Sequence, residues 1–291
     1  MSQKYVNPNK VSILLSVYNG DKYLADLLDS IINQSCNDFT LYIRDDGATD
    51  SSLSIMRDYS KRFDNIVLID DFNNLGSKYS FLYMMCMIES DYYMFCDQDD
   101  VWKTDKVKIS LNSLKKMERN YPDTPLIIHT DLEIVDGNLN TIAKSYWKHL
   151  KIPVDMPHTF EMMCHFNDVT GCAMAFNKSA RNLYFKYKDV LLPKHVYHDL
   201  LISLLTVKYG GLIIPVHQST ILFRRHGQNE TDPLANDRSI LERPLRIFIF
   251  TREQFKRYKF YNQFGYGSFL KFVYYKIVTK MTLKIWKRKL A

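Results

Sequence analysis

Short apolar runs alternate with amphipathic segments between residues 11 and 129, and this alternation is the strongest constraint on the fold of the chain. Residues 11–17 (VSILLSV) are apolar and partly β-branched, and apolar residues with helical spacing follow after Asp21. Repetition of this pair predicts strands at 11–17, 39–44, 66–69, 92–96 and 126–129, and helices at 21–32, 50–63, 78–88 and 103–120. Because consecutive βαβ units pair their strands in parallel, we expect an α/β fold with a mainly parallel sheet flanked by helices.

The alternation loosens after residue 136. Residues 141–165 combine a tryptophan, two prolines and three histidines without a clean period, which predicts a long functional loop or lid. Further on, the pattern predicts strands at 172–176, 212–215 and 220–224 and helices at 179–187 and 198–209. A polar stretch at 228–244 is typical of a linker. We therefore expect a catalytic domain at 1–235 and a separate tail at 236–291.

The charge of the chain supports this division. The formal net charge is +7, but residues 240–291 carry thirteen Lys and Arg against two Glu, a net +11, which leaves −4 for residues 1–239. The tail also has an apolar stripe at Leu270, Val273, Ile277, Met281 and Ile285, beside a basic row at Lys276, Lys280, Lys284 and Arg288. This spacing predicts an amphipathic helix that lies on an anionic membrane surface. The alternatives are a helix folded back on the body or a contact between copies of the chain; no nucleic-acid motif accompanies the charge.

The sequence also bears on the compartment. It has neither a run of about 18 apolar residues nor a signal-peptide pattern at its start, so we expect a protein that stays inside the cell. Five cysteines without a CxxC pair indicate neither a disulfide framework nor a zinc site.

Polar residues follow three of the predicted strands directly: Tyr18-Asn19, Asp45-Asp46 and the run 97–100 (DQDD). Ligands of open α/β sheets bind beyond the carboxyl ends of the strands, so these side chains are expected to converge on one cleft. Asp97 and Asp99 are two residues apart in an extended segment and can face one hard cation, Mg²⁺ or Mn²⁺. The alternative for this motif is a solvated acidic loop.

These segments together resemble the family-2 glycosyltransferases, which are inverting enzymes with the GT-A fold that use nucleotide-sugar donors. The resemblance is carried by VSILLSVYNGDKYL (11–24), IRDDGATDSS (43–52), NNLG (73–76), FCDQDDVWKTDKV (95–107), TGCAMAFN (170–177), HDLLISLLTVKYGG (198–211) and FRRHGQNET (223–231). Each motif is weak alone, but the set and its order are specific. Within the family, the DQDDVW, HD and RRHG segments are most similar to bacterial rhamnosyltransferase-type enzymes of cell-surface polysaccharide synthesis.

The resemblance implies a donor site. Tyr18, with Asn19, would lie beside the nucleotide base, and the carboxylate of Asp46 would accept a hydrogen bond from a base N–H. Asp97 and Asp99 would frame the metal and the donor sugar, with Asp99 as the direct ligand. Asp45 and Asp50 would support the loop, the latter as a helix cap, and Asp100 would stand behind the metal ligands or cap the next helix.

The resemblance also implies the remaining roles. Asp199 would be the base that deprotonates the acceptor hydroxyl, although it can equally cap the helix that follows. His226 would contact the metal or the diphosphate, or be an exposed loop histidine. Arg224 and Arg225 would lie at the leaving diphosphate, or be surface charges. Gly171 and Cys172 would lie on the acceptor side, or form the start of a core strand.

The expected function is metal-dependent, inverting transfer of a sugar to a hydroxyl of a lipid-linked cell-surface polysaccharide, with the enzyme at the inner face of the membrane. The resemblance favours a dTDP-rhamnose donor, followed by UDP-sugars. One alternative is a sugar-phosphate nucleotidyltransferase, but residues 16–20 lack the Gly-rich, basic loop that holds a triphosphate. The other is a non-catalytic membrane-surface scaffold.

Overall fold

A nine-stranded sheet forms the centre of the structure, which is a computed structural model. The structure describes residues 5–7, 9–69, 71, 73–188, 196–226 and 243–289, and only the backbone at 243–251. Its strand order within this described part is β4-β3-β2-β6-β10-β8-β11-β7, and β9 pairs with β8. The strands are β2 (Val11–Val17), β3 (Phe39–Asp45), β4 (Ile66–Ile69), β6 (Tyr92–Cys96), β7 (Val101–Trp102), β8 (Leu126–Val135), β9 (Thr141–Ala143), β10 (Met174–Asn177) and β11 (Leu212–Arg224). A separate parallel pair is formed by β1 (Tyr5–Val6) and β5 (Ile88–Glu89).

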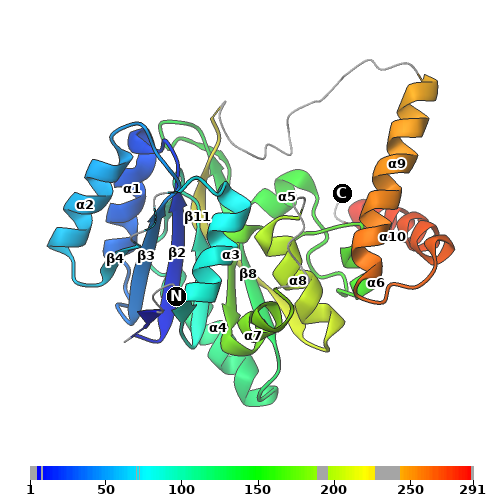
Figure 1. The fold of residues 1–291 in the computed structure, drawn as a ribbon, viewed down its shortest axis with the longest axis horizontal. Helices are drawn as coiled ribbons and strands as arrows, with labels where there is room; N and C mark the ends of the chain where they lie inside the picture. Colours follow the sequence, from blue (N-terminus) through cyan, green and yellow to red (C-terminus); the bar gives the residue numbers. More distant parts are fainter. Residues whose placement is uncertain are drawn as a thin grey trace.

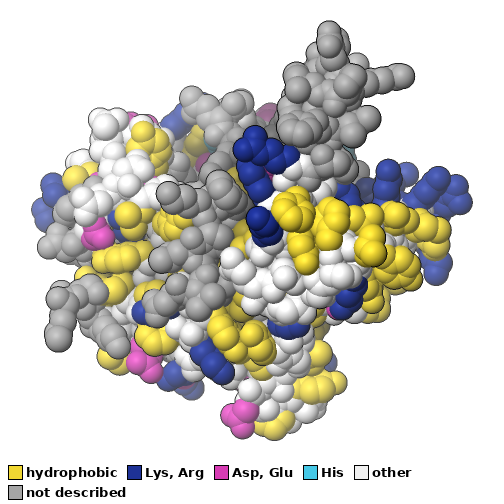
Figure 2. All heavy atoms as spheres, turned by 45° about the vertical axis from the view of Figure 1, so that its right-hand side comes forward, with side chains coloured by type: hydrophobic (Ala, Val, Ile, Leu, Met, Phe, Trp, Pro, Cys, Tyr) yellow, Lys and Arg dark blue, Asp and Glu magenta, His cyan; other side chains and the backbone are white. Residues whose placement is uncertain are grey.

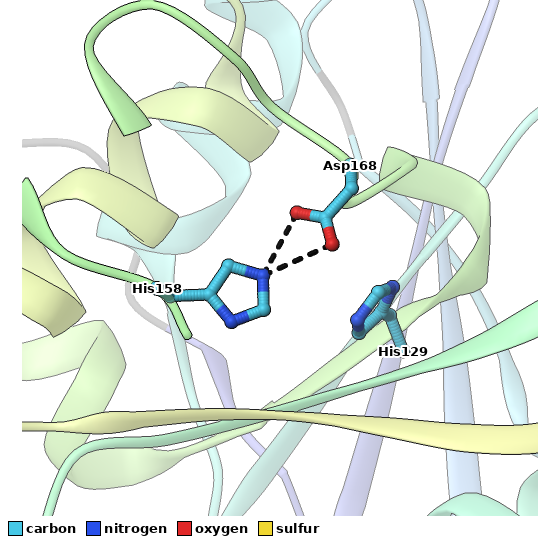
Figure 3. A group of neighbouring side chains, drawn as sticks. All are labelled: His129, His158 and Asp168. Atoms are coloured by element: carbon cyan, nitrogen blue, oxygen red, sulfur yellow. Dashed lines mark hydrogen bonds and ion pairs between the residues drawn. The ribbon is translucent and has the colours of Figure 1, made fainter. Parts of the chain in front are cut away.

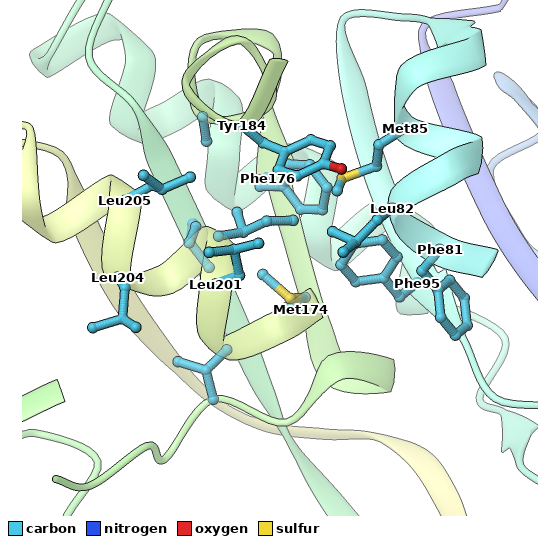
Figure 4. Packing of buried hydrophobic residues seen from close by; sticks show 14 of the residues in the cluster. Phe81, Leu82, Met85, Phe95, Met174, Phe176, Tyr184, Leu201, Leu204 and Leu205 are labelled. Atoms are coloured by element: carbon cyan, nitrogen blue, oxygen red, sulfur yellow. The ribbon is translucent and has the colours of Figure 1, made fainter. Parts of the chain in front are cut away.

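Helices cover both faces of the sheet, as Figure 1 shows. Strand residues alternate between the two faces, so Ile13 and Leu15 pack with α1, α2 and α4, whereas Leu14 packs on the opposite side. Helices α3, α7 and α8 cover that opposite side, where their apolar residues meet Phe95 and Phe176 (Figure 4). The helices are α1 (Asp21–Ile32), α2 (Ser52–Arg62), α3 (Ser77–Met87), α4 (Lys106–Asn120), α5 (Tyr146–Leu150), α6 (Phe160–Met163), α7 (Lys178–Tyr187), α8 (His198–Lys208), α9 (Arg243–Asn262) and α10 (Phe269–Lys289).

The strand directions gather the polar loops at one edge. Strands β3, β2 and β6 are adjacent and parallel, with Val17 opposite Asp45 and Leu15 opposite Cys96. Strand β10 is antiparallel to β6 and to β8, so it starts at the edge where β6 ends, and the short 3₁₀ turn η1 (Gly171–Ala173) precedes it. Strand β11 is parallel to β8 and therefore also ends at this edge. Residues far apart in sequence thus emerge side by side.

The α/β architecture is confirmed, with differences in the second half of the chain. Parallel pairing holds from β4 to β6, but β10 inserts antiparallel between β6 and β8, so the sheet is mixed. The strand predicted at 126–129 continues to Val135 because β11 pairs with it along its whole length. The strands predicted at 212–215 and 220–224 are one strand with irregular register between Val216 and Ile221. The helix predicted from 103 begins at Lys106, so Asp100 does not cap it.

The segment predicted as a loop or lid at 141–165 contains three short elements, β9, α5 and α6. Two side chains start its helices. Ser145 accepts a hydrogen bond from the backbone N–H of Lys148, and Thr159 accepts one from Met162. These caps stabilise turns that are too short to show a helical period in the sequence. The strand predicted at 172–176 begins two residues later, after the 3₁₀ turn.

The tail packs beside α6, at the right of Figure 1. Its aromatic residues Tyr261, Phe264, Tyr266 and Phe272 are buried in the same cluster as Phe160. Lys271 also forms an ion pair with Glu161, with 2.8 Å between Nζ and Oε1. The predicted boundary at 235 and residues 228–242 of the linker predicted at 228–244 lie outside the described residues. None of the helices in the described ranges is both long and apolar enough to cross a membrane.

The predicted helix of the tail is present as α10, and its apolar stripe faces outward. The exposed fractions are 79% for Leu270, 56% for Ile277, 61% for Met281 and 54% for Ile285, whereas Phe272 on the inner side is fully buried. Figure 2 shows hydrophobic side chains gathered in this part of the molecule, with Lys and Arg side chains along their border. The helix therefore packs on the body with one side and leaves the predicted stripe uncovered.

Candidate active site

A cavity of about 720 Å³ opens at the edge where β2, β3, β6 and β11 end. It brings together eight of the residues predicted from the sequence. They are Tyr18, Asn19, Asp46, Asp97, Asp99, Gly171, Asp199 and His226. The other predicted residues, Cys172, Arg224 and Arg225, are not among the residues that line it.

The loop after β2 is fixed by a side chain from the DQDD motif. Gln98 accepts a hydrogen bond from the backbone N–H of Tyr18 at 2.8 Å and donates one to its carbonyl at 2.9 Å. A Cβ on Gly20 would lie 2.7 Å from the Gln98 side chain, so a larger residue here would displace Gln98 from these hydrogen bonds. Asn19 has a left-handed φ of 48° and accepts a hydrogen bond from Thr49 N–H. The half-exposed ring of Tyr18 is therefore presented to the cavity on a rigid loop.

Asp46 is positioned by an arginine that is fully buried. One terminal nitrogen of Arg44 contacts Asp46 Oδ1 at 2.5 Å and also donates to Ser80. The same carboxylate oxygen accepts the backbone N–H of Leu75 at 2.8 Å. These contacts of Asp46 all use Oδ1, which leaves Oδ2 for a ligand in the cavity. The guanidinium thus lies directly against the carboxylate, whose oxygens are hydrogen-bond acceptors.

Asp45 and Asp50 support the neighbouring loop, although the N-cap of α2 is Ser51 and not Asp50 as expected. Asp45 Oδ1 accepts the backbone N–H of Ala48 at 2.8 Å. The two oxygens of Asp50 accept the N–H groups of Asp21 and Ser52, both at 3.0 Å, at the starts of two helices. Neither aspartate lines the cavity.

Asp99 and His226 meet directly, although 127 residues separate them. The distance from His226 Nε2 to Asp99 Oδ2 is 2.8 Å, and both side chains are only partly exposed. Tyr23 packs against the imidazole, with 5.0 Å between ring centroids, and holds it in place. A carboxylate and an imidazole that are neighbours can share a divalent cation once this direct contact opens slightly. Asp97 lines the same cavity, and its carboxylate also lies near Asp100 and Cys172.

Asp100 and Cys172 stand behind the cavity wall. Both are fully buried, and burial raises the pKa of the Cys172 thiol, which is therefore neutral. Burial, together with the charges of Asp99 and Asp97, also raises the pKa of Asp100. Asp100 accepts the backbone N–H of Arg224 at 3.2 Å and so anchors the end of β11 against the acidic motif. Cys172 is thus a core residue next to the cavity.

Asp199 lies in the first turn of α8 and faces the cavity with Gly171. Burial raises its pKa from 3.8 to about 6, against hydrogen bonds from backbone N–H groups that favour the ionised form. One of these donors is Leu200, at 2.6 Å from Oδ1. A carboxylate with this pKa is ionised at neutral pH but is a stronger base than an exposed aspartate. The helix starts one residue before Asp199, with Tyr197 at the N-cap position, so Asp199 is not its N-cap, and the predicted role as a base is compatible with this position.

His198 is a packed histidine. Its ring lies 4.3 Å from that of Phe81 and 4.5 Å from that of Phe95, and burial lowers its pKa to about 3. A Cβ on residue 171 would come within 3.1 Å of its Nε2, so Gly171 allows η1 to approach α8 closely. This contact sets the distance between Gly171 and Asp199.

Arg224 points away from the cavity. Its guanidinium contacts Asp26 Oδ2 at 2.8 Å and the carbonyls of Asp99 and Gly137, and it stacks on Tyr23 at 4.2 Å. It therefore ties the end of β11 to α1 and to the acidic loop. Arg225 follows in a half-buried position outside the lining.

Several lining residues were not predicted from the sequence. They are Ser16, Gly20, Lys22, Tyr23, Asn74, Gly76, Ser77, Phe81, Gln98, Thr170, Tyr197, His198 and Phe223. Gln98 was detectable in principle, because it stands between the two acids of a strand-end motif. Lys22 brings a positive charge to the cavity from the start of α1, on the helix that follows the first motif. Arg44 does not line the cavity, and nothing in the sequence distinguishes it from a surface arginine.

Comparison with known proteins agrees with this geometry. Residues 12–181 match the family described as Glycosyl transferase family 2. Among curated proteins, the dTDP-rhamnosyl transferase RfbG of Shigella flexneri is 32% identical over 105 residues, which is 34% of this chain and 36% of RfbG. The chain thus spans just over a third of that relative's length.

Solved structures show the same fold. S. aureus TarS 1–349 in complex with UDP-GlcNAc superposes with a TM-score of 0.54 at 18% identity, over 75% of this chain and 59% of that one. The mannosyltransferase PcManGT from Pyrobaculum calidifontis, in complex with GDP-Man and Mn²⁺, gives 0.53 at 12% identity, over 87% of this chain and 63% of that one. The family match covers more than half of the chain, including the strand ends that carry Tyr18, Asp46 and Asp97. The chain belongs to glycosyl transferase family 2.

Proposed function

We propose that this chain transfers a sugar from a nucleotide donor to an acceptor hydroxyl with inversion at the anomeric carbon. The observation that carries the proposal is the convergence of Asp46, the Asp99–His226 pair and Asp199 on one cavity. These groups supply a hydrogen-bond acceptor for a base, a candidate cation site and a candidate proton acceptor. Membership of the family favours sugar transfer over the nucleotidyltransferase and scaffold alternatives.

In the proposed reaction, Asp199 takes the proton of the acceptor hydroxyl as its oxygen bonds to the anomeric carbon. The bond between that carbon and the diphosphate oxygen breaks at the same time, and the nucleoside diphosphate leaves from the opposite face. The ring of Tyr18 would stack on the nucleotide base, and Asp46 Oδ2 would accept a hydrogen bond from an N–H of that base. Among the described residues that line the cavity, Lys22 is the one lysine or arginine, so we assign it to the diphosphate in place of Arg224.

Asp99 and His226, with Asp97 nearby, are the residues that would hold a divalent cation. Their oxygen and nitrogen donors suit Mn²⁺ or Mg²⁺, and the structure of PcManGT with GDP-Man and Mn²⁺ supports this choice. When bound, the cation would neutralise charge on the diphosphate.

For the donor, we propose dTDP-rhamnose first, because RfbG is described as a dTDP-rhamnosyl transferase. The UDP-GlcNAc complex of TarS supports UDP-sugars as the next class. The acceptor proposed is a lipid-linked cell-surface polysaccharide.

We also propose that residues 236–291 attach the enzyme to an anionic membrane surface through α10. Its exposed apolar stripe, from Leu270 to Ile285, runs beside exposed Lys280, Lys284 and Arg288. An anionic bilayer matches both features, because its interface accepts apolar side chains and its charge attracts basic ones. Each Lys or Arg near the lipid surface contributes about 1 kcal/mol to binding. Pairing of two such helices would bring like charges together and is less favourable.

The function is tested by measuring thermal unfolding with a panel of nucleotide sugars, each with and without Mn²⁺. A donor that binds the native state at a hundredfold excess over its Kd stabilises it by about 2.7 kcal/mol. The expected result is stabilisation by one nucleotide class, which Asp46→Asn removes and the exposed Asp64→Asn leaves intact. Stabilisation by no nucleotide sugar, with or without metal, would contradict the proposal. A hit is then followed by transfer assays with polysaccharide acceptors.

A further inference from the structure

A second group of metal-binding side chains lies outside the active-site cavity. His129 on β8, His158 just before α6 and Asp168 just after it offer ligand atoms that all lie within 4.8 Å of one another. Figure 3 shows the carboxylate of Asp168 between the two imidazole rings. None of the three residues lines the cavity.

His129 is a buried imidazole that lacks a partner among the described residues. Its side chain is fully buried, and neither ring nitrogen forms a hydrogen bond. Its ring centroid lies 6.2 Å from that of His158, and Trp147 packs on it at 5.2 Å. Native proteins pair nearly all buried polar groups, because an unpaired one destabilises the fold. The position therefore points to a ligand for at least one of these nitrogens.

His158 and Asp168 form the other half of the group. The distances from His158 Nε2 to the two oxygens of Asp168 are 2.8 and 3.0 Å, and the side chains are only 9% and 2% exposed. Ligand atoms around a tetrahedral zinc ion, with bonds of about 2.0–2.2 Å, lie about 3.4 Å apart. The pair would have to open by about half an ångström, and His129 would have to approach, to reach this arrangement. Both are small side-chain movements.

We propose that His129, His158 and Asp168 bind a zinc ion, with water as the fourth ligand. Two imidazole nitrogens and one carboxylate oxygen form a set that Zn²⁺ accepts, whereas Mg²⁺ and Ca²⁺ prefer oxygen ligands alone. Iron sites with two histidines and one carboxylate keep positions open to a substrate. Three protein ligands with water in the fourth position are also found in catalytic zinc sites, but this group is buried and lies outside the cavity, so we assign the ion a role in the fold. The site uses no cysteine, so the cysteine pattern of the sequence does not reveal it.

The ion would tie an irregular part of the chain to the sheet. His129 belongs to the central strand β8, while His158 and Asp168 flank α6 on the excursion between β9 and η1. Asp168 is two residues before Thr170, which lines the active-site cavity together with Gly171. Zinc would thus fix the wall that faces Asp199 without taking part in the reaction. This inference does not depend on the identity of the sugar.

The experiment uses the full chain carrying His226→Asn, so that a cation at Asp99 and His226 does not contribute. The metal-free protein is titrated with Zn²⁺, and bound metal is measured by equilibrium dialysis with elemental analysis. We expect one zinc per chain and a rise in Tm of roughly 5–10 °C at a hundredfold excess over Kd. The test variants are His158→Gln and Asp168→Asn, and the matched control is His149→Gln, an exposed histidine on α5.

Both test variants should lose the bound zinc and the Tm shift, and the control should keep them. Asp168→Asn preserves the shape of the side chain and a hydrogen bond to His158. This variant therefore tests zinc binding even if His158→Gln does not fold. Co²⁺ gives a second readout, because tetrahedral coordination produces visible absorption bands and the ion should quench the fluorescence of the adjacent Trp147. Absence of zinc binding by the folded chain, or binding that survives in both test variants, would overturn the proposal.

Discussion

Replacement of Asp199 by asparagine separates the proposed role of this residue as a base from its effect on the stability of the fold. Asparagine keeps the shape of the side chain and an oxygen that can accept the Leu200 N–H, but it cannot take a proton from the acceptor. Loss of a general base lowers the rate by roughly 10²–10⁴-fold. We expect kcat of Asp199→Asn to fall by about 10³-fold, with donor binding unchanged.

The raised pKa of Asp199 predicts that the same replacement stabilises the folded protein, although it lowers turnover. Its pKa is about 6 in the folded chain against an ordinary value of 3.8, a difference of about 2 units, or about 3 kcal/mol. Because the folded pKa is the higher one, the native state is penalised once the pH exceeds both values, and the penalty disappears below the unfolded pKa. Since the side chain is partly exposed, we expect Asp199→Asn to stabilise the protein by about 1–3 kcal/mol at pH 8, and by almost nothing near pH 3.5.

Two assays test this pair of effects. Released nucleoside diphosphate measures turnover, and kcat/KM of the unmodified enzyme should fall tenfold per pH unit below about 6, where Asp199 becomes protonated. Urea unfolding at several pH values gives the stability difference, with the exposed Asp64→Asn as a control that should change neither quantity. Full turnover by Asp199→Asn would remove this residue from the mechanism. A stability difference that does not vary with pH would refute the raised pKa.

Three further predictions concern the supports of the cavity and the tail. Gln98→Ala removes both hydrogen bonds to the Tyr18 backbone, so KM for the donor should rise about tenfold with kcat less affected, as steady-state kinetics would show. Arg44→Met leaves a buried carboxylate unpaired and should lower the free energy of unfolding by about 3–5 kcal/mol in urea titrations; a loss below 1 kcal/mol would contradict the role given to this ion pair. The double replacement Ile277→Glu and Met281→Glu should abolish sedimentation with anionic vesicles. It should not lower Tm, because both side chains are more than half exposed. Unchanged sedimentation would exclude α10 as the membrane contact.

Much of the active-site geometry follows from local sequence patterns. The apolar runs before Tyr18, Asp46 and Asp97 predicted three strands, and parallel pairing of β2, β3 and β6 brings their ends together. The sequence also predicted the placement of Asp199 at the start of a helix. These features are local, because the period of apolar residues and the residue after a strand can be read within one segment.

Other features depend on burial and on contacts between distant segments. Arg44 and Arg224 are both almost completely buried, and each holds an acidic loop in place, yet the sequence predicted burial for neither and expected Arg224 at the diphosphate. The long strand β8 was underestimated because its polar residues look like a loop until β11 pairs with them. For example, Thr130 bonds Thr220 on β11 at 2.7 Å.

By itself, the sequence determined the order along the chain of the main strands and helices up to β8, the polar groups at the strand ends and the apolar stripe of the tail, because each depends on the spacing of residues within one element. Only the tertiary structure decided which side of α10 is covered, that β10 inserts antiparallel, and that His129, His158 and Asp168 come together. The physical reason is that burial and long-range pairing are set by packing of the whole chain. No single segment contains that information.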